Sequence, residues 1–388
     1  MDALPRHNSA RSDYGEHEEA IVRYREEGTR RALAMTNRGP LTVDATGKVT
    51  QEVVDAYNEF GFYVFEGVLS EDELGDLEAD VADLLDRAPS HRGSKVDRHG
   101  RPALGSENEA RSVTFAKPLA DPVGGTEATY GRHQAKMIEL DPPEGAPEEI
   151  VQLVSGALQF SEAYLRLYGH PSLLAFAEAI HGKDFTPFHE AIWIKQPGLG
   201  GSVAWHQDGF THWDSPDLDE NTHGFNYMAQ VYGCDAENGL WVIPGSHRNG
   251  KLDIKQMVAD AGSDRIPSAV PLICAPGDVA VTNRQAIHGS FANTSDRFRV
   301  SMTFGFHRRS SVLNVRSGGV HSAVTDYTDD YIRSRSKLIQ FGIEARKLRF
   351  PKEKAYVYEP FVDRVSDFAW NSDRLAELRD YNLQDLGI

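Results

Sequence analysis

The chain has 388 residues, 40% hydrophobic and 26% charged, a composition typical of a globular protein that can bury one large core or two smaller ones. Its formal net charge of −17 argues against nonspecific binding to nucleic acid or to an anionic membrane, because both need a basic surface. It contains no apolar run near the roughly 18 residues of a membrane span, and its first residues lack the apolar stretch of a secretory signal, so a cytoplasmic protein is expected.

The first part of the chain is predicted to be mainly helical. Helices are expected over 16–35, 50–60 and 70–87, with a strand over 61–65. Residues 1–48 are polar and should form a loosely packed, partly helical N-terminal arm. The clearest helix start is Ser70 with Glu73 three residues later, a capping box in which each side chain bonds to the other residue's backbone N–H. Thr50 is expected to cap the preceding helix.

A long segment without predicted secondary structure follows. Residues 90–140, rich in Gly, Arg, Ser and Pro over their first part, are expected to form a lid-like loop. Basic side chains of this segment could select an acidic group of a ligand: Arg101, Lys117, Arg132 and Lys136. Two further helices are predicted after it, over 147–168 and 171–181.

After these helices the pattern changes to short β-rich runs separated by turn residues. Strands are expected over 187–195, 202–207, 224–233, 239–243, 278–282, 285–290 and 298–306. Many short strands at this spacing favour a sandwich or a jelly-roll barrel. The only two cysteines, Cys234 and Cys274, lie far apart in this region. They do not make a disulfide framework or a Cys-rich zinc site, which fits a reducing cytoplasm.

The domain organisation follows from these patterns. Residues 49–320 are expected to form one domain, mainly β with flanking helices, and residues 321–388 a helical extension packed on its core. Basic side chains near and within the extension are interleaved with acidic ones, which favours a solvated helical face over a dock for an anionic handle. A homodimer formed through the terminal helical extensions is the expectation for assembly.

The first motif that carries chemistry is a His-x-Asp pair, His206 and Asp208. Alternate residues of a strand point to the same side, so both can bind one metal ion from a straight backbone. A second His would complete a 2-His-1-carboxylate site, which suits Fe(II) and leaves coordination positions open. The motif is weak alone, and His212 with Asp214 matches the same spacing. The first pair is favoured because it ends an apolar run after a glycine-rich turn, whereas the second lies in a loop.

A third metal ligand is expected at His288, which follows a Pro-Gly-Asp turn and an apolar strand. Downstream, Arg299, Ser301 and Thr303 share one face of the last predicted strand, and the intervening apolar residues share the other. An arginine directed into a protein interior is costly unless it has an anionic partner. The carboxylate of a co-substrate would fit its guanidinium fork. Arg297 has the same parity and remains a rival for this role.

Together these motifs resemble the phytanoyl-CoA dioxygenase family of 2-oxoglutarate-dependent oxygenases over about residues 53–306. The matching blocks are 61–65 with the 70–85 helix, 205–209, 237–247, and 288–290 with Asn293, Ser295 and Arg299. Blocks in the family's order and approximate spacing are more specific than any single motif. The resemblance implies a double-stranded β-helix, the cupin-like jelly roll, which agrees with the strand pattern.

Carried over residue by residue, the resemblance implies an Fe(II) centre that performs catalysis on His206, Asp208 and His288. It implies that Arg299 binds 2-oxoglutarate with help from Ser290, and that O2 is the other co-substrate. The expected reaction is hydroxylation of an unactivated C–H bond of a small-molecule metabolite, with release of succinate and carbon dioxide. Desaturation, epoxidation or ring rearrangement of a natural-product intermediate would need the same cofactors. Related halogenases carry a small residue at the position of Asp208, so the carboxylate here favours oxidation.

The chain departs from the family pattern at several positions. Met228 stands where a tryptophan often contacts the co-substrate. Its neighbours on the same strand face, Asn226 and Gln230, could hold the 2-oxoglutarate carboxylates instead or line the cavity generally. Lys195 lies where family members often have a Lys-Pro segment, and could reach the pocket or belong to a plain turn.

The sequence leaves the substrate open. Residues near the ligand motifs are candidates for substrate contact: Phe210, His212, Trp213 and Trp241. Their rings would suit a hydrophobic or ring-bearing small molecule, and each is equally explained by core or loop packing. Two other classes remain as alternatives. A zinc hydrolase would leave Arg299 without a purpose, and a non-catalytic jelly-roll metal- or ligand-binding protein would use the histidines only structurally.

Overall fold

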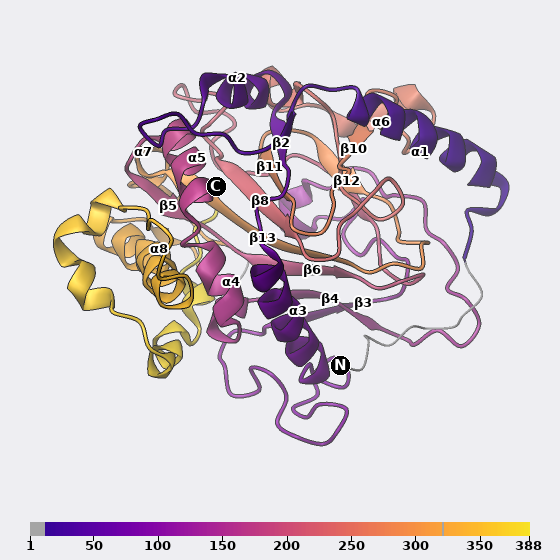
Figure 1. Cartoon of the computed structure of the whole chain (residues 1–388). Coiled ribbons are helices and arrows are strands. Elements are labelled where there is room, and N and C mark those ends of the chain that lie inside the picture. The colour runs from indigo at the N-terminus through magenta and orange to yellow at the C-terminus, as the bar shows by residue number, and fades with distance from the viewer. Residues whose placement is uncertain (1–11, 320–321) are drawn as a thin grey trace.

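The computed structural model describes residues 12–319 and 322–388 (Figure 1). Residues 1–11, which begin the expected arm and were considered for a secretory signal, lie outside the described residues. The helices are α1 (Glu18–Leu33), α2 (Gln51–Phe60), α3 (Glu71–Asp86), α4 (Glu162–Leu167), α5 (Pro171–His181), α6 (Ile254–Ala261), α7 (Arg309–Val312) and α8 (Asp329–Arg349). The strands are β1 (Arg38–Gly39), β2 (Phe62–Phe65), β3 (Val113–Ala116), β4 (Ile150–Ser155), β5 (Phe185–Pro187), β6 (Ala191–Lys195), β7 (Val203–His206), β8 (Phe225–Gln230), β9 (Trp241–Val242), β10 (Val270–Pro271), β11 (Val279–Asn283), β12 (His288–Ser290), β13 (Arg299–Arg308), β14 (Arg316–Ser317) and β15 (Thr325–Asp326).

Two sheets form the centre of the molecule. The larger, nine-stranded sheet contains the neighbouring strands β11-β8-β13-β6, and the four-stranded sheet has the order β10-β9-β12-β7. The chain from β6 to β13 therefore passes back and forth between the two sheets, and all of these strand pairs are antiparallel. This is the topology of a double-stranded β-helix, or jelly roll. The predicted fold class, mainly β with flanking helices around a jelly-roll core, is confirmed.

Helices α3, α4, α5 and α8 lie together on one side of the larger sheet (Figure 1). The alternation of β13 explains the packing, because Val300, Met302, Phe304 and Phe306 all join the apolar core beneath these helices and are fully buried. Arg299 has the opposite parity and faces away from that core. Within the described part of the chain, no helix is both long and apolar enough to cross a bilayer.

The two sheets pack against each other through a second apolar cluster. It joins side chains of the larger sheet to side chains on or beside the smaller one: Phe62, Val64, Met228 and Ala280 with Leu240, Val242, Val270 and Leu272. Within this cluster, Cys234 and Cys274 lie opposite each other, and their backbones exchange two N–H···O bonds of 2.9 Å. Both are buried free thiols. Residues forty positions apart are therefore neighbours here, which the sequence did not predict.

Helix α1 is part of the fold rather than a loosely packed arm. Tyr24 stacks on Trp241 of the smaller sheet with a centroid separation of 4.3 Å. Gly28 lies against the same ring so closely that a Cβ there would come within 2.5 Å of it. Ile21, about one turn before Tyr24, is fully buried. The polar composition of this segment hid a narrow apolar face that packs on the smaller sheet.

Two local predictions need correction. The helix expected over 147–168 is instead β4 followed by the short helix α4, because the β-branched residues of β4 pair with β3 and β6 at the edge of the larger sheet. Thr50 precedes α2 but its side chain does not cap the helix, and its Oγ1 hydrogen-bonds to Thr42 Oγ1 at 2.8 Å. The capping box of Ser70 and Glu73 is present as predicted.

Candidate metal centre

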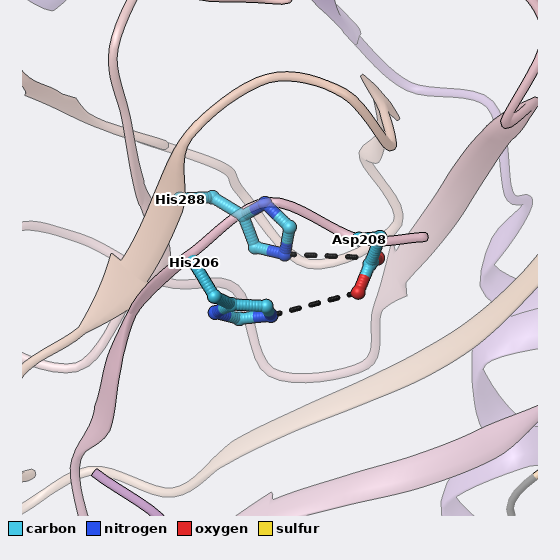
Figure 2. A group of neighbouring side chains, drawn as sticks. All are labelled: His206, Asp208 and His288. Atoms are coloured by element: carbon cyan, nitrogen blue, oxygen red, sulfur yellow. Dashed lines mark ion pairs between the residues drawn. The ribbon is translucent and has the colours of Figure 1, made fainter. Parts of the chain in front are cut away.

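His206 and His288 lie close together because their strands are paired. Strand β7 ends at His206, β12 begins at His288, and the two residues are direct partners across this antiparallel pair. Asp208 follows two residues after β7, and its backbone N–H donates to the carbonyl of Arg284 at 2.8 Å. One ligand atom from each of the three side chains lies within 4.8 Å of the other two (Figure 2). The structure thus brings together the three residues predicted as metal ligands.

Both imidazoles turn their Nε2 atoms toward Asp208. Because a carbonyl can only accept a hydrogen bond, Nδ1 of His206 donates to Ala204 O at 2.8 Å, and Nδ1 of His288 donates to Ala286 O at 2.9 Å. These bonds leave a lone pair on each Nε2. The Nε2 atoms lie 3.7 and 3.9 Å from the two carboxylate oxygens (Figure 2). Burial lowers the pKa of His206 well below its usual value, so the ring is neutral, as a metal ligand must be.

Asp208 is surrounded by donors and cations. Arg132 Nη1 donates to its Oδ1 at 2.7 Å, and Asn226 Nδ2 donates to its Oδ2 at 3.1 Å. Arg284 Nε lies 3.7 Å from Oδ2. Burial alone would raise the pKa of Asp208, but the positive charges of Arg132 and Arg284 outweigh it and hold the pKa well below normal. Asp208 is therefore an ionised carboxylate that can bind a cation.

The second His-x-Asp pair does not join this group. It lies in the loop between β7 and β8, where His212 is half-buried and Asp214 is exposed. The His212 ring is 6.3 Å from the ring of His223, measured between centroids. Trp213 packs edge-on against the same His223 at 4.4 Å, and its Nε1 donates to Gly209 O at 2.9 Å. Position at the end of a strand, not spacing, separates the two motifs.

Part of the predicted lid covers the metal centre. Arg132 forms the ion pair with Asp208, and the adjacent His133 stacks on His206 at a centroid distance of 4.1 Å. His133 is 5% exposed, and burial lowers its pKa to about 4. Residues 129–133 therefore form a layer of protein directly over the ring of His206, and we call this segment the cover.

The same segment is held down by aromatic stacking. Tyr130 stacks on Phe210 with centroids 4.1 Å apart, so Phe210, predicted as a substrate residue, contacts the cover. Thr129 and Tyr130 have left-handed φ values of 52° and 60°, which are uncommon for residues other than glycine. A hydrogen bond of 2.8 Å between Thr129 Oγ1 and His133 Nδ1 supports this turn. The backbone strain is thus matched by contacts that order the cover.

The other basic residues singled out in the lid lie elsewhere. Arg101 pairs with Asp86 at 2.5 Å, and Lys136 pairs with Glu139 at 2.9 Å. Lys117 is exposed. Of the four candidates for selecting an acidic group, Arg132 is the one that contacts a metal-site residue.

A separate buried cation lies on β13. Arg299 is 4% exposed, and its Nε donates to Ser301 Oγ at 2.9 Å. Ser301 Oγ in turn donates to Gln230 Oε1 at 2.9 Å. Burial lowers the pKa of Arg299, and no carboxylate of residues 12–319 or 322–388 counters this effect. Arg299 is therefore a buried guanidinium without a carboxylate partner among the described residues.

The rival Arg297 is in a different position. Its side chain is 54% exposed and forms ion pairs with Asp235 and Glu237. These two carboxylates satisfy Arg297 at the surface, so it does not need an anionic ligand. Of the two candidate arginines, Arg299 is therefore the buried one and Arg297 the exposed one.

Lys195 is a strand residue and not part of a turn. It is the direct partner of Arg299 across the β6–β13 pair, and it is 3% exposed. Its Nζ donates to Phe291 O. Burial, followed by the charge of Arg299, lowers the pKa of Lys195 well below its usual value. Directly opposite side chains of an antiparallel pair are neighbours, so the buried amine of Lys195 and the buried guanidinium of Arg299 lie side by side.

The remaining predicted residues occupy varied positions. Asn226 bonds to Asp208, so it supports a metal ligand. Met228 belongs to the apolar cluster between the sheets. Ser290 is 1% exposed on β12. Trp241 is fully buried against α1, in a core cluster outside the metal site, which corrects its prediction as a substrate residue.

Three residues of the site were missed: His133, Arg284 and His223. Arg284 lies four residues before His288, directly after β11, and closeness to a ligand strand was the signal that could have marked it. His133 and His223 reach the site from segments whose placement depends on tertiary structure, so the sequence held no comparable signal for them.

This geometry defines a class of protein. Two neutral imidazoles and one ionised carboxylate, delivered by neighbouring strands of a jelly roll, form the 2-His-1-carboxylate site of non-haem iron(II) oxygenases. The donor set fits Fe(II), since hydrogen bonds to neighbouring backbone and amide groups orient all three ligands.

Comparison with known proteins identifies the family. The model of the family "Phytanoyl-CoA dioxygenase (PhyH)" matches residues 57–301. The chain is 26% identical over 267 residues to "Phytanoyl-CoA dioxygenase" of Arabidopsis thaliana, covering 66% of this chain and 87% of the relative. It is 26% identical over 193 residues to "L-proline trans-4-hydroxylase" of Streptomyces griseoviridis, covering 43% and 72%. The crystal structure of EctD from S. alaskensis with bound Fe is 19% identical, with a TM-score of 0.47 and coverage of 70% and 80%.

The chain belongs to the phytanoyl-CoA dioxygenase family. It is a 2-oxoglutarate-dependent non-haem iron oxygenase, with Fe(II), 2-oxoglutarate and O2 as its cofactor and co-substrates. Family membership together with the assembled His-Asp-His group favours this class over the zinc-hydrolase and non-catalytic alternatives.

Proposed function

We propose that this oxygenase hydroxylates an unactivated C–H bond of a small-molecule metabolite, while 2-oxoglutarate is converted to succinate and carbon dioxide. The iron, when bound, supplies the oxidising chemistry. In this proposal His206, Asp208 and His288 hold it from one side and leave the opposite side for co-substrates and substrate. The carboxylate of Asp208 occupies a coordination position, which supports oxidation over halogenation.

The observation that carries the proposal is the buried Arg299. A buried guanidinium without an anion is costly, and 2-oxoglutarate has a second carboxylate beyond the keto acid that binds metal. The guanidinium fork of Arg299 matches that carboxylate. Ser301, bonded to Gln230, orients Arg299 through its Nε. Lys195 adds a neighbouring positive side chain, and Ser290 is the proposed helper on β12.

The cover over the metal site has a role in this chemistry. His133 stacks on His206, and Arg132 neutralises Asp208, so both protect the ligand ring and carboxylate from bulk water. Exclusion of water limits side reactions of an oxidising metal centre. The ring stack of Tyr130 on Phe210 anchors this cover. Ordering of the cover is therefore proposed to be part of catalysis.

Family relatives support a small-molecule substrate, since one is named for hydroxylation of L-proline. The net charge of −17 supports an enzyme that acts without nucleic acid or a membrane surface, and a cytoplasmic location is part of the proposal. A homodimer through the terminal helices remains part of the proposal. So does a division into an arm at 1–48, whose helix α1 packs on the smaller sheet, a domain at 49–320 and an extension at 321–388.

The direct test is anaerobic addition of Fe(II) and then 2-oxoglutarate to the purified protein. A weak visible charge-transfer band that depends on both is expected, and its absence would contradict the proposal. Succinate release is then screened over candidate metabolites in air, and the products are analysed by mass. A gain of one oxygen indicates hydroxylation or epoxidation, which NMR distinguishes, whereas loss of two hydrogens indicates desaturation and an unchanged mass indicates rearrangement. A band without succinate from any metabolite would support the non-catalytic alternative.

A further inference from the structure

Two arginines from different elements approach Asp208. Arg132, on the cover, donates to Oδ1, and Arg284, after β11, lies near Oδ2. Their side chains are only 17% and 7% exposed. Arg284 is further fixed in place, because its guanidinium stacks over Phe188 at 4.3 Å from the ring centroid. Both cations are therefore largely buried within the site.

Once iron and 2-oxoglutarate are bound, Asp208 would be shared between the metal and these two arginines, which pair with it in this structure. The two positive charges of Fe(II) are matched by Asp208 and by the metal-binding carboxylate of 2-oxoglutarate. The second carboxylate of 2-oxoglutarate is matched by Arg299. Arg132 and Arg284 then remain as buried positive charges in excess, which is costly without a further anion.

Unpartnered polar atoms surround Arg284 as well. Arg284 Nη1 donates to His223 O at 2.9 Å and lies 3.1 Å from His307 Nε2, but its Nε has no hydrogen-bond partner among the described residues. His223 is fully buried, and neither of its ring nitrogens has a partner in the described parts of the chain. The same holds for Nδ1 of His212, whose ring is 6.3 Å from that of His223. Since more than about 90% of buried polar groups in proteins are paired, this cluster indicates a polar ligand.

We propose that the primary substrate carries a carboxylate, which Arg284 and Arg132 bind beside the metal. This inference rests on the proposed function, and it adds a carboxylate to the hydrophobic or ring-bearing substrate that the aromatic residues of the sequence suggest. Arg284 is the fixed half of the site, and Arg132 is the half carried by the cover. His223 and His212 provide further hydrogen bonds to polar groups of the same substrate.

This arrangement links substrate recognition to closure of the site. Arg132 reaches the metal centre on the same segment as His133 and Tyr130, which pack on His206 and Phe210. A carboxylate that binds Arg132 therefore also stabilises the segment that covers the metal. A neutral analogue of the same shape gains neither the ion pair nor this ordering.

The test uses a panel of small carboxylic acids, amino acids included, each paired with its primary amide. Binding to the protein loaded with Zn(II) and 2-oxoglutarate is measured by ligand-observed NMR, and stimulation of succinate release is measured with Fe(II). At least one acid is expected to bind about tenfold or more tightly than its amide, the difference typical of a lost charge-assisted hydrogen bond. If every amide matches its acid, or if no acid binds, the inference is overturned.

Variants of the two arginines test whether they cause the preference for an acid over its amide. Arg284→Met and Arg132→Met should each bring the ratio of acid affinity to amide affinity close to one. Because Arg284 is the more buried residue, its variant could fail to fold, and Arg132→Met then still tests the inference. Arg38→Met is the matched control, since Arg38 is 23% exposed and paired with Glu66 away from the site, and it should keep the preference. Retention of the preference in both site variants overturns the inference. Absence of the charge-transfer band in the wild-type protein is a different result and contradicts the proposed function itself.

Discussion

His206 and His288 are direct cross-strand partners, and this pairing places their Nε2 atoms 3.7 and 3.9 Å from the carboxylate oxygens of Asp208. We therefore expect Asp208→Ala to lose tight Fe(II) binding, because two imidazoles alone remain. Asp214→Ala is the matched control, since it removes the exposed carboxylate of the other His-x-Asp pair. Metal content after desalting should fall by at least about tenfold in the first variant and stay unchanged in the second. Equal metal content in both would remove Asp208 from the ligand set.

The affinity for 2-oxoglutarate is expected to depend on Arg299. Arg299→Met removes the buried guanidinium, and loss of a charge-assisted hydrogen bond costs about 1.5–3 kcal/mol, or roughly tenfold to a hundredfold in affinity. Arg297→Met leaves this affinity unchanged, because Arg297 is exposed and paired with Asp235 and Glu237. Anaerobic titration of the charge-transfer band with 2-oxoglutarate measures both values. The opposite pattern, with only Arg297→Met affected, would assign the carboxylate to Arg297.

Binding of 2-oxoglutarate is expected to take up protons through Lys195. Burial lowers the pKa of Lys195, the charges of Arg299 and Arg25 lower it further, and Asp121 opposes them. A ligand carboxylate at Arg299 favours the charged ammonium and raises this pKa, so affinity should fall as pH rises through it. Titration calorimetry in buffers of different ionisation enthalpy measures the uptake. Lys195→Met should reduce it and Lys136→Met should not. Equal uptake in all three proteins would exclude Lys195.

The same lowered pKa has a consequence for the unliganded protein. In the window between the folded and unfolded pKa values of Lys195, the unfolded chain binds more protons than the folded chain. The contribution of Lys195 to the free energy of unfolding therefore rises with pH across that window. Comparison of wild type with Lys195→Met in denaturant titrations at several pH values isolates this contribution, and a difference that is flat with pH would contradict it.

Local patterns in the sequence were sufficient for much of the fold. The alternation along β13 separated Val300 and Met302, which pack under the helices, from Arg299, which faces the other way. The Ser70–Glu73 capping box marked the start of α3 correctly. These predictions succeed because period and capping are properties of neighbouring residues.

Features that depend on tertiary contacts could not be predicted in the same way. Trp241 lies within the 237–247 block that resembles the family, yet its ring packs against α1, where Tyr24 stacks on it. Arg284 and Arg132 converge on Asp208 from segments about 150 residues apart. The β-branched residues of β4 appeared helical because their partners, β3 and β6, were not both recognised. In each case the missing information was the identity of the neighbour.

The C-terminal extension is expected to stabilise the fold through buried ion pairs, of which Arg335 with Asp385 is the more deeply buried example. Arg335 Nη2 lies 2.6 Å from Asp385 Oδ1, and both side chains are almost fully buried. The same Nη2 donates to Phe188 O at 2.8 Å, and Phe188 supports the guanidinium of Arg284. Arg335→Met leaves the buried Asp385 without its guanidinium partner, with His189 Nδ1 still 2.8 Å from Oδ2, and this should lower the free energy of unfolding by about 3–5 kcal/mol. Urea titration followed by circular dichroism measures this loss.

A double variant distinguishes the loss of the attraction between Arg335 and Asp385 from the cost of leaving Asp385 buried without Arg335. Arg335→Met combined with Asp385→Leu removes both buried charges, so it should recover most of the stability that Arg335→Met loses. The surface pair of Arg316 and Asp326, whose side chains are 67% and 63% exposed, is the matched control, and Arg316→Met should change the free energy of unfolding by less than about 1 kcal/mol. If Arg335→Met is as mild as Arg316→Met, the extension is held by its apolar residues, Leu386 and Ile388, which are buried against Phe188.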